Sequence, residues 1–136
     1  MLGALLAGTS AAGAQARPSG HVDVIEVDGL LDSVLVDFVG RALDVAERTD
    51  AAALVLQMNS TGGVAPADDL RALTRRLREA DVPVTVWVGG SGRPRAFGAA
   101  YAMVAAAAVV GVAPGARLGS DSPGLTGGEA LRRGVV

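Results

Sequence analysis

The sequence contains no cysteine and no lysine, and each absence excludes a kind of chemistry. Without cysteine, the chain has no disulfide, no thiolate nucleophile and no thiolate metal ligand. All 12 basic residues are arginine, and arginine keeps its proton in proteins. No side-chain amine of this chain can therefore act as a general base.

Aromatic residues make up only 3% of the chain, although half of it is hydrophobic, so valine, leucine and alanine must build the core. A length of 136 residues suits one domain. The net charge of -2 gives no electrostatic basis for binding nucleic acid. No apolar run approaches the roughly 18–20 residues of a membrane-spanning helix. No pattern calls for a cofactor or a metal, and none is expected.

Residues 1–20 resemble a signal peptide rather than part of the fold. A short apolar run leads through small residues to Ala14 and Ala16, a pattern typical of signal-peptidase cleavage after Ala16. The usual positive start is missing, so a simple alanine- and glycine-rich leader is the alternative. The signal interpretation predicts a domain over residues 21–136 that is exported or membrane-associated on the extracytoplasmic side.

Strand and helix patterns alternate along residues 21–136. Strands are predicted at 21–28, 52–58, 82–88 and 109–112, and helices at 33–49, 66–80 and 96–107. In the first helix Leu35, Phe38, Val39 and Leu43 recur at helical spacing, which predicts a core face. Residues 115–128 lack periodicity and predict a mobile loop. The pattern indicates an α/β fold with a mainly parallel sheet.

The second predicted strand ends in Asn59, Ser60, Thr61, Gly62 and Gly63, just before the second helix. Two glycines leave backbone N–H groups open to a ligand, and a helix N-terminus favours negative charge. Such a turn can serve as an oxyanion hole, or it can be a plain connection between strand and helix.

A second loop, with Ser91, Gly92, Phe97 and Gly98, follows the third predicted strand. Ligands of parallel α/β sheets bind at the carboxyl ends of the strands. We therefore expect Ser60, Thr61, Ser91, Gly92, Phe97 and Gly98 to line one cleft. His21 lies at the far end of the first strand, with no carboxylate placed to orient it.

Four segments in order, residues 25–29, 59–63, 91–101 and 113–119, resemble the protease domain of the NfeD-type membrane-associated serine proteases. The similarity covers about residues 22–122 and implies the ClpP/crotonase-like fold of repeated βα units with a mainly parallel sheet. Full members of the family continue into membrane helices and a small β-barrel domain. Relative to them, this domain is expected to be incomplete at its C-terminus.

The resemblance also implies a site: a Ser–Lys dyad beside an oxyanion hole that a Gly-Gly pair supplies. The glycine pair falls on Gly62 and Gly63, with Thr61 where the family has proline. The nucleophile position falls on Phe97 and the lysine position on Gly134. Neither residue can perform its role, so the expected function is a non-catalytic module that binds an extended hydrophobic peptide or a membrane protein, or that serves in assembly. A homo-oligomer is expected by the same resemblance.

Two alternatives stay open. An active hydrolase could use a substitute nucleophile among Ser60, Thr61, Ser91, Ser120 and Ser122, with Asp121 or the distant His21 as the base. A crotonase-like enzyme for acyl thioesters could hold an enolate at Gly63 and use Asp121 or Glu129 as its acid or base.

Overall fold

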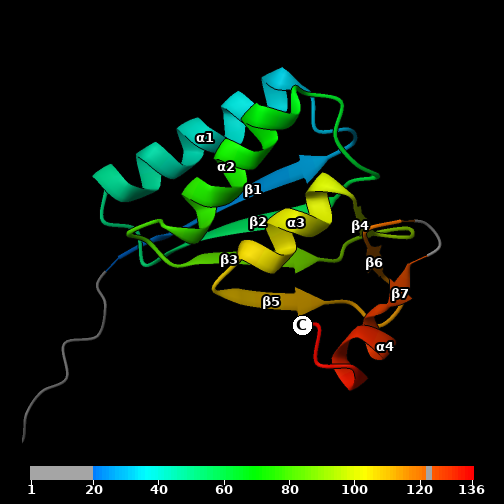
Figure 1. Ribbon diagram of the computed structural model, residues 1–136. Coiled ribbons are helices and arrows are strands. Elements are labelled where there is room, and N and C mark those ends of the chain that lie inside the picture. The colour runs from blue at the N-terminus through cyan, green and yellow to red at the C-terminus, as the bar shows by residue number, and fades with distance from the viewer. Residues whose placement is uncertain (1–19, 122–123) are drawn as a thin grey trace, which may run out of the picture.

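The computed structural model describes residues 20–121 and 124–136, and it is organised around a four-stranded parallel sheet (Figure 1). The predicted signal segment, apart from its last residue, lies outside the described residues. The sheet has the order β1-β2-β3-β5, and all of its neighbouring strands are parallel. These strands are β1 (Val22–Asp28), β2 (Ala53–Asn59), β3 (Val84–Val88) and β5 (Val109–Val112). The predicted α/β fold with a mainly parallel sheet is confirmed.

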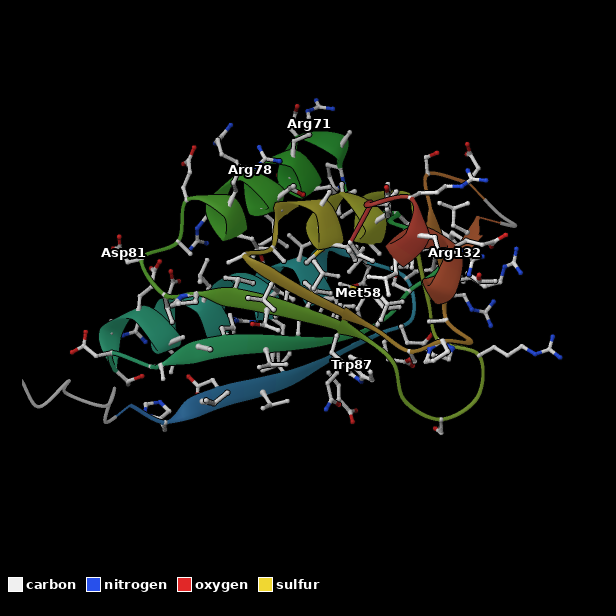
Figure 2. The ribbon with its side chains drawn as sticks, turned by 90° about the horizontal axis from the view of Figure 1, so that it is seen from below. Met58, Arg71, Arg78, Asp81, Trp87 and Arg132 are labelled. Atoms are coloured by element: carbon white, nitrogen blue, oxygen red, sulfur yellow. The ribbon has the colours of Figure 1, made fainter. Side chains whose placement is uncertain are left out.

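Three helices, α1 (Ser33–Arg48), α2 (Ala67–Arg78) and α3 (Ala99–Ala106), cover one face of this sheet (Figure 1). Alternation along β2 sends Leu54, Leu56 and Met58 into the core beneath them, where all three side chains are fully buried. The helix α2 adds Leu73 and Leu77 to the same core. Its Arg71 and Arg78 side chains point away from the sheet (Figure 2).

The helix α1 begins where predicted, because the Asp32 side chain accepts a hydrogen bond from the Leu35 N–H and caps it. Its buried face differs from the prediction. Val36, Val39 and Leu43 form the buried stripe, whereas the Phe38 side chain is 42% exposed. The predicted core position of Phe38 is wrong, since at 100° per residue it lies well to the side of that stripe.

A smaller sheet lies beyond the carboxyl ends of the large one, in the order β4-β6-β7 (Figure 1). It consists of β4 (Arg95–Phe97), β6 (Arg117–Gly119) and β7 (Leu125–Thr126), and β7 leads into the short helix α4 (Gly127–Arg132). The predicted helix at 96–107 starts later because its first residues pair as β4. The segment predicted as a loop at 115–128 is not wholly irregular, since half of its residues form β6, β7 and the start of α4. Residues 122–123 of this segment lie outside the described residues.

Within the described residues, no helix is long and apolar enough to cross a bilayer.

Candidate functional site

The turn after β2, residues 59–63, lies directly beside β4, and we call it the glycine turn. The Ser60 N–H donates to the Arg95 carbonyl oxygen (2.8 Å), and the Phe97 N–H donates to the Ser60 carbonyl oxygen (3.1 Å). The Asn59 Oδ1 also accepts from the Arg95 N–H (3.2 Å). The two loops expected to share a site are therefore joined by backbone hydrogen bonds.

Ser60 holds the glycine turn in shape. Its side chain is only 1% exposed. Its Oγ donates to the Gly62 carbonyl oxygen (3.1 Å) and accepts from the Gly62 N–H (3.3 Å). A hydroxyl that is buried and bonded in this way is a structural group of the turn, not a free nucleophile, and it occupies one of the two amides expected in the oxyanion hole.

The second amide of the glycine turn, the Gly63 N–H, is open. Leu31 pairs with this segment like a parallel strand: its N–H donates to the Gly62 carbonyl (2.9 Å), and its carbonyl accepts from the Val64 N–H (3.0 Å). Because successive backbone groups alternate in direction, the Gly63 N–H points away from Leu31. Among the described residues it has no hydrogen-bond partner.

Close packing explains why position 63 is glycine. A Cβ there would lie 2.8 Å from the Leu70 side chain and 3.1 Å from the Ala99 Cβ. The first residues of α2 and α3 thus press against the glycine turn from one side.

Gly98 is the residue that turns the chain from β4 into α3. Its backbone has φ 55° and ψ −119°, in the left-handed half of conformational space that favours glycine. A strained residue between a strand and a helix is the arrangement that presents the nucleophile in α/β-hydrolases. A Cβ at Gly98 would lie 3.8 Å from the Gly62 Cα and meet nothing else within 4 Å. Position 98 therefore faces the glycine turn.

The neighbouring residue Phe97 directs its ring elsewhere. The side chain is 8% exposed, and a Cβ added at Gly124 would come within 2.6 Å of the Phe97 Cε1, so the ring lies against Gly124. Phe97 thus has its backbone beside Ser60 and its ring under the connection between β6 and β7. Sequence reasoning treated Gly98 as a lining residue only, although a glycine immediately before a helix was a signal for a special backbone conformation.

The Gly98 N–H is not available to a ligand. It donates to the Gly119 carbonyl oxygen (3.1 Å), as part of the contact between β4 and β6. Of the three amides at the glycine turn and the start of α3, those of Gly62, Gly63 and Gly98, only the Gly63 N–H is unpaired among the described residues.

Ser91 lines a polar hollow of about 300 Å³ at the carboxyl ends of the large sheet. The hollow is lined by Glu26, Asp28, Gln57, Asn59, Gly89, Gly90 and Ser91. Asn59 connects it to the glycine turn, since its Nδ2 donates to the Asp28 Oδ1 (2.6 Å). Gly92, which follows Ser91, and Thr61, in the glycine turn, are both exposed. Gly92 has a positive φ of 83°.

Gly134, expected at the family's lysine position, follows α4 near the C-terminus. It is exposed, and a Cβ there would meet nothing within 4 Å. The helix α4 packs on β6 and β7 and faces Val110 and Val112 of β5. An amine at this position would lie in solvent, and solvent exposure favours its charged form.

The remaining candidates for acid, base or nucleophile are scattered. The Ser120 Oγ donates to the Asp121 Oδ2 (3.3 Å), next to Gly119 and thus close to the start of α3. Ser122 lies outside the described residues. Glu129 forms a capping box with Thr126, whose N–H and hydroxyl both donate to the carboxylate (2.8 Å each).

These two hydrogen bonds, first the one from the backbone N–H, lower the pKa of Glu129 below its ordinary value. The carboxyl group is therefore ionised near neutral pH, and it accepts hydrogen bonds from Thr126. It lacks the proton that an acid catalyst for acyl thioesters would need.

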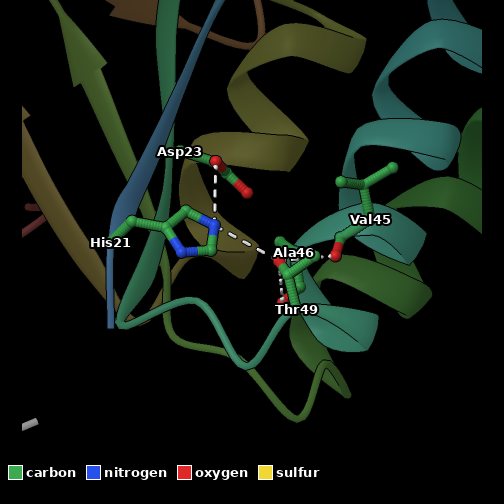
Figure 3. Close-up of polar contacts among 5 residues, drawn as sticks. All are labelled: His21, Asp23, Val45, Ala46 and Thr49. Atoms are coloured by element: carbon green, nitrogen blue, oxygen red, sulfur yellow. Dashed lines mark hydrogen bonds and ion pairs between the residues drawn. The ribbon is translucent and has the colours of Figure 1, made fainter. Parts of the chain in front are cut away.

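His21 belongs to a separate polar cluster at the other end of the large sheet (Figure 3). Its Nε2 lies 3.4 Å from the Asp23 Oδ1 and 3.2 Å from the Thr49 Oγ1. The expectation that no carboxylate is placed near His21 is wrong, because alternation along β1 puts Asp23 on the same side. A catalytic triad needs the carboxylate and the hydroxyl on different ring nitrogens, whereas both lie at Nε2 here.

No cluster of three or more histidine, cysteine or acidic side chains that could hold a metal occurs in the described part of the chain.

Comparison with known proteins finds relatives in sequence and in structure. A membrane-bound protease of Pyrococcus horikoshii is 26% identical over 102 residues, which cover 75% of this chain and 22% of that protein. The chain is a homologue of this NfeD-type protease. It spans about a fifth of the length of that curated relative. No family model matches the sequence.

Solved structures agree on the fold. A lysine-to-alanine mutant of 1510-N membrane-bound stomatin-specific protease, in complex with a substrate peptide, has a TM-score of 0.68 at 24% identity. The match covers 81% of this chain and 50% of the solved chain. A methylmalonyl CoA decarboxylase matches with a TM-score of 0.62 at 22% identity, over 76% of this chain and 45% of that one. The neighbours thus include ClpP-like proteases and crotonase-fold enzymes.

Proposed function

We propose that this chain is a non-catalytic peptide-binding module built on the ClpP-like protease fold. The observation that carries the proposal is the contrast between two parts of the site. The Gly63 N–H remains open to a ligand, while the two residues that lead into α3, Phe97 and Gly98, carry no hydroxyl. Binding a peptide through a backbone amide needs only an open N–H group, whereas acyl transfer needs an open N–H group and a nucleophilic hydroxyl.

An extended peptide is the ligand that suits an unpaired backbone amide beside a strand-like segment. Such a peptide can align with residues 62–64 and accept from the Gly63 N–H through a carbonyl oxygen, as in strand addition. Val64, which is 65% exposed next to Gly63, offers an apolar contact for a side chain of the peptide. The solved neighbour with a bound substrate peptide has the same fold, which supports this choice.

Peptide binding is tested by removing the Gly63 N–H. Gly63→Pro lacks the donor, and Gly63→Ala is the matched control because it adds a Cβ at the same crowded place but keeps the N–H. We expect fluorescence anisotropy with a labelled, extended apolar peptide to show at least a fivefold weaker affinity for Gly63→Pro than for Gly63→Ala. Equal affinities of the two variants would contradict the proposed mode.

Non-catalysis is tested on the same samples. Mass spectrometry of the peptide after overnight incubation should find it intact, and a serine-directed fluorophosphonate should leave the protein unlabelled. Cleavage or labelling would refute a non-catalytic role.

The alternative of a substitute nucleophile retains one specific observation in its favour, the contact between Ser120 and Asp121 near the start of α3. A carboxylate at 3.3 Å is a weak base for a serine hydroxyl. If labelling does occur, loss of the label in Ser120→Ala would assign it to this pair.

A further inference from the structure

The strand β1 forms an open edge of the large sheet. It pairs with β2 and with no other strand of the described residues (Figure 2). At one end of β1, the His21 carbonyl oxygen accepts from the Ala52 N–H (2.8 Å). At the other end, the Gly29 N–H donates to the Asn59 carbonyl oxygen (3.0 Å). Odd-numbered backbone groups thus face β2, and the groups that point outward belong to Val22, Val24, Glu26 and Asp28.

This edge can accept an extended segment along its whole length. Edge strands that resist pairing are short, or they carry proline, lysine or a bulge. The strand β1 has seven residues, no proline and no lysine, and its register with β2 is unbroken. An antiparallel segment beside β1 would form hydrogen-bonded pairs with its four outward residues.

The side chains of these four residues divide the edge into an apolar half and an acidic half. Val22 and Val24 are 53% and 54% exposed. Glu26 and Asp28 are exposed as well, and neither forms an ion pair with a basic residue of the described part of the chain. The acidic half therefore attracts a cationic segment and repels an acidic one.

Glu26 and Asp28 also line the polar hollow of about 300 Å³, whose lining includes no basic residue. The Asn59 Nδ2 donates to the Asp28 Oδ1 (2.6 Å). This bond leaves the Asp28 Oδ2 and both carboxylate oxygens of Glu26 without a partner among the described residues. A guanidinium group has five N–H donors and no acceptor, so it suits a hollow with unused carboxylate oxygens.

We propose that β1 binds an extended, basic segment of another protein, which joins the large sheet as an antiparallel strand. Basic residues of the segment lie opposite Asp28 and Glu26, and apolar residues lie opposite Val24 and Val22. Read from its N-terminus, the segment has the pattern basic-x-basic-x-apolar-x-apolar. Arginines at the two basic positions reach over β1 toward the polar hollow.

This surface uses different backbone groups from the peptide site proposed at Gly63. It also selects a different ligand, because the Gly63 site offers an apolar contact and the β1 edge offers negative charge. A failure of one proposal therefore leaves the other unaffected.

The acidic half of the edge is tested by removing its charge. The probe is the labelled peptide Arg-Thr-Arg-Thr-Val-Thr-Val, followed by fluorescence anisotropy at about 50 mM salt, where charge pairs are weakly screened. We expect the double variant Glu26→Gln, Asp28→Asn to bind it about tenfold more weakly than the unchanged chain, because both ion pairs are lost.

A second double variant is the matched control for charge. Asp69→Asn with Glu79→Gln removes the same charge from exposed positions on α2. It should change the affinity by less than about twofold, because these positions lie away from β1 and solvent screens their charge. Circular dichroism confirms that both double variants are folded.

Strand addition is tested on the peptide. N-methylation of its second arginine, opposite Glu26, removes an N–H that points at β1, whereas N-methylation of the threonine that follows changes an N–H that points away. We expect the first peptide to bind at least about fivefold more weakly than the second. Absence of binding to the unchanged chain, equal binding to the Glu26→Gln, Asp28→Asn variant, or equal effects of the two N-methyl groups would each overturn the proposal.

Discussion

At the scale of single residues, the site depends on which side chain faces the glycine turn. A Cβ added at position 98 would point toward Gly62, whereas the Phe97 ring lies against Gly124. The positive φ of Gly98 fits its place between β4 and α3, and a larger residue there would cost roughly 1–3 kcal/mol of backbone strain. A side chain at position 98 would thus face the glycine turn, and the chain has glycine there.

Because the chain has no cysteine, single cysteines can report on this geometry without background. We expect Gly98→Cys to react with iodoacetamide at least tenfold faster than Phe97→Cys. The thiol at 98 is exposed at a helix N-terminus, which favours the thiolate, and the side chain at 97 is buried. Mass spectrometry against time gives both rates. Faster reaction at 97 would place Phe97, not Gly98, at the glycine turn, as the family alignment alone implies.

The buried hydroxyl of Ser60 should be worth measurable stability. Ser60→Ala removes the Oγ that bonds both backbone groups of Gly62, and we expect it to lower the free energy of unfolding by about 1–2 kcal/mol. The neighbouring exposed Thr61→Ala should change it by less than about 0.5 kcal/mol. Urea unfolding measures both. Equal effects would show that Ser60 does not hold the turn.

At the scale of elements, the short helix α4 is stabilised by its capping box. Thr126 and Glu129 satisfy each other's backbone groups, and the motif Thr-x-x-Glu is visible in the sequence at 126–129. The residues before it were still predicted as a loop, because β6 and β7 are too short to show a period. They exist because β6 pairs with β4 and with β7, contacts that connect distant segments of the chain.

The capping box makes stability depend on pH in a defined direction. The folded pKa of Glu129 lies below its ordinary value of about 4.3, so the folded state binds fewer protons there than the unfolded state. Its stabilising effect is complete above the ordinary pKa and disappears as the pH falls through the lower folded pKa. In Glu129→Gln this dependence should vanish, because the amide does not titrate. Thermal unfolding of both proteins between about pH 6 and pH 3 checks this. Identical pH profiles would contradict the role of Glu129.

At the scale of the whole molecule, the sequence predicted the large sheet and its helices because their apolar patterns are long and periodic. It also predicted that the loops after β2 and β3 share a site, since parallel strands end at a common edge. It could not predict the direction of the Phe97 ring or the bond between the Gly98 and Gly119 backbones. Both depend on the small sheet, whose strands pair segments that lie apart in the sequence. The exposed position of Phe38 was missed for a related reason, because two overlapping stripes on α1 fit the same helical period.

The central claim is that the Gly63 amide binds an extended peptide in a site that does not cut it. Two-dimensional NMR of the ¹⁵N-labelled chain, titrated with an apolar peptide, observes this amide directly. We expect the Gly63 N–H signal to move downfield and saturate with the peptide, as an amide does on gaining a hydrogen bond, while the signals of His21 and Asp23 stay in place and the peptide remains intact. An unchanged Gly63 signal under saturating peptide, or the appearance of cleaved peptide in the same tube, would contradict the account.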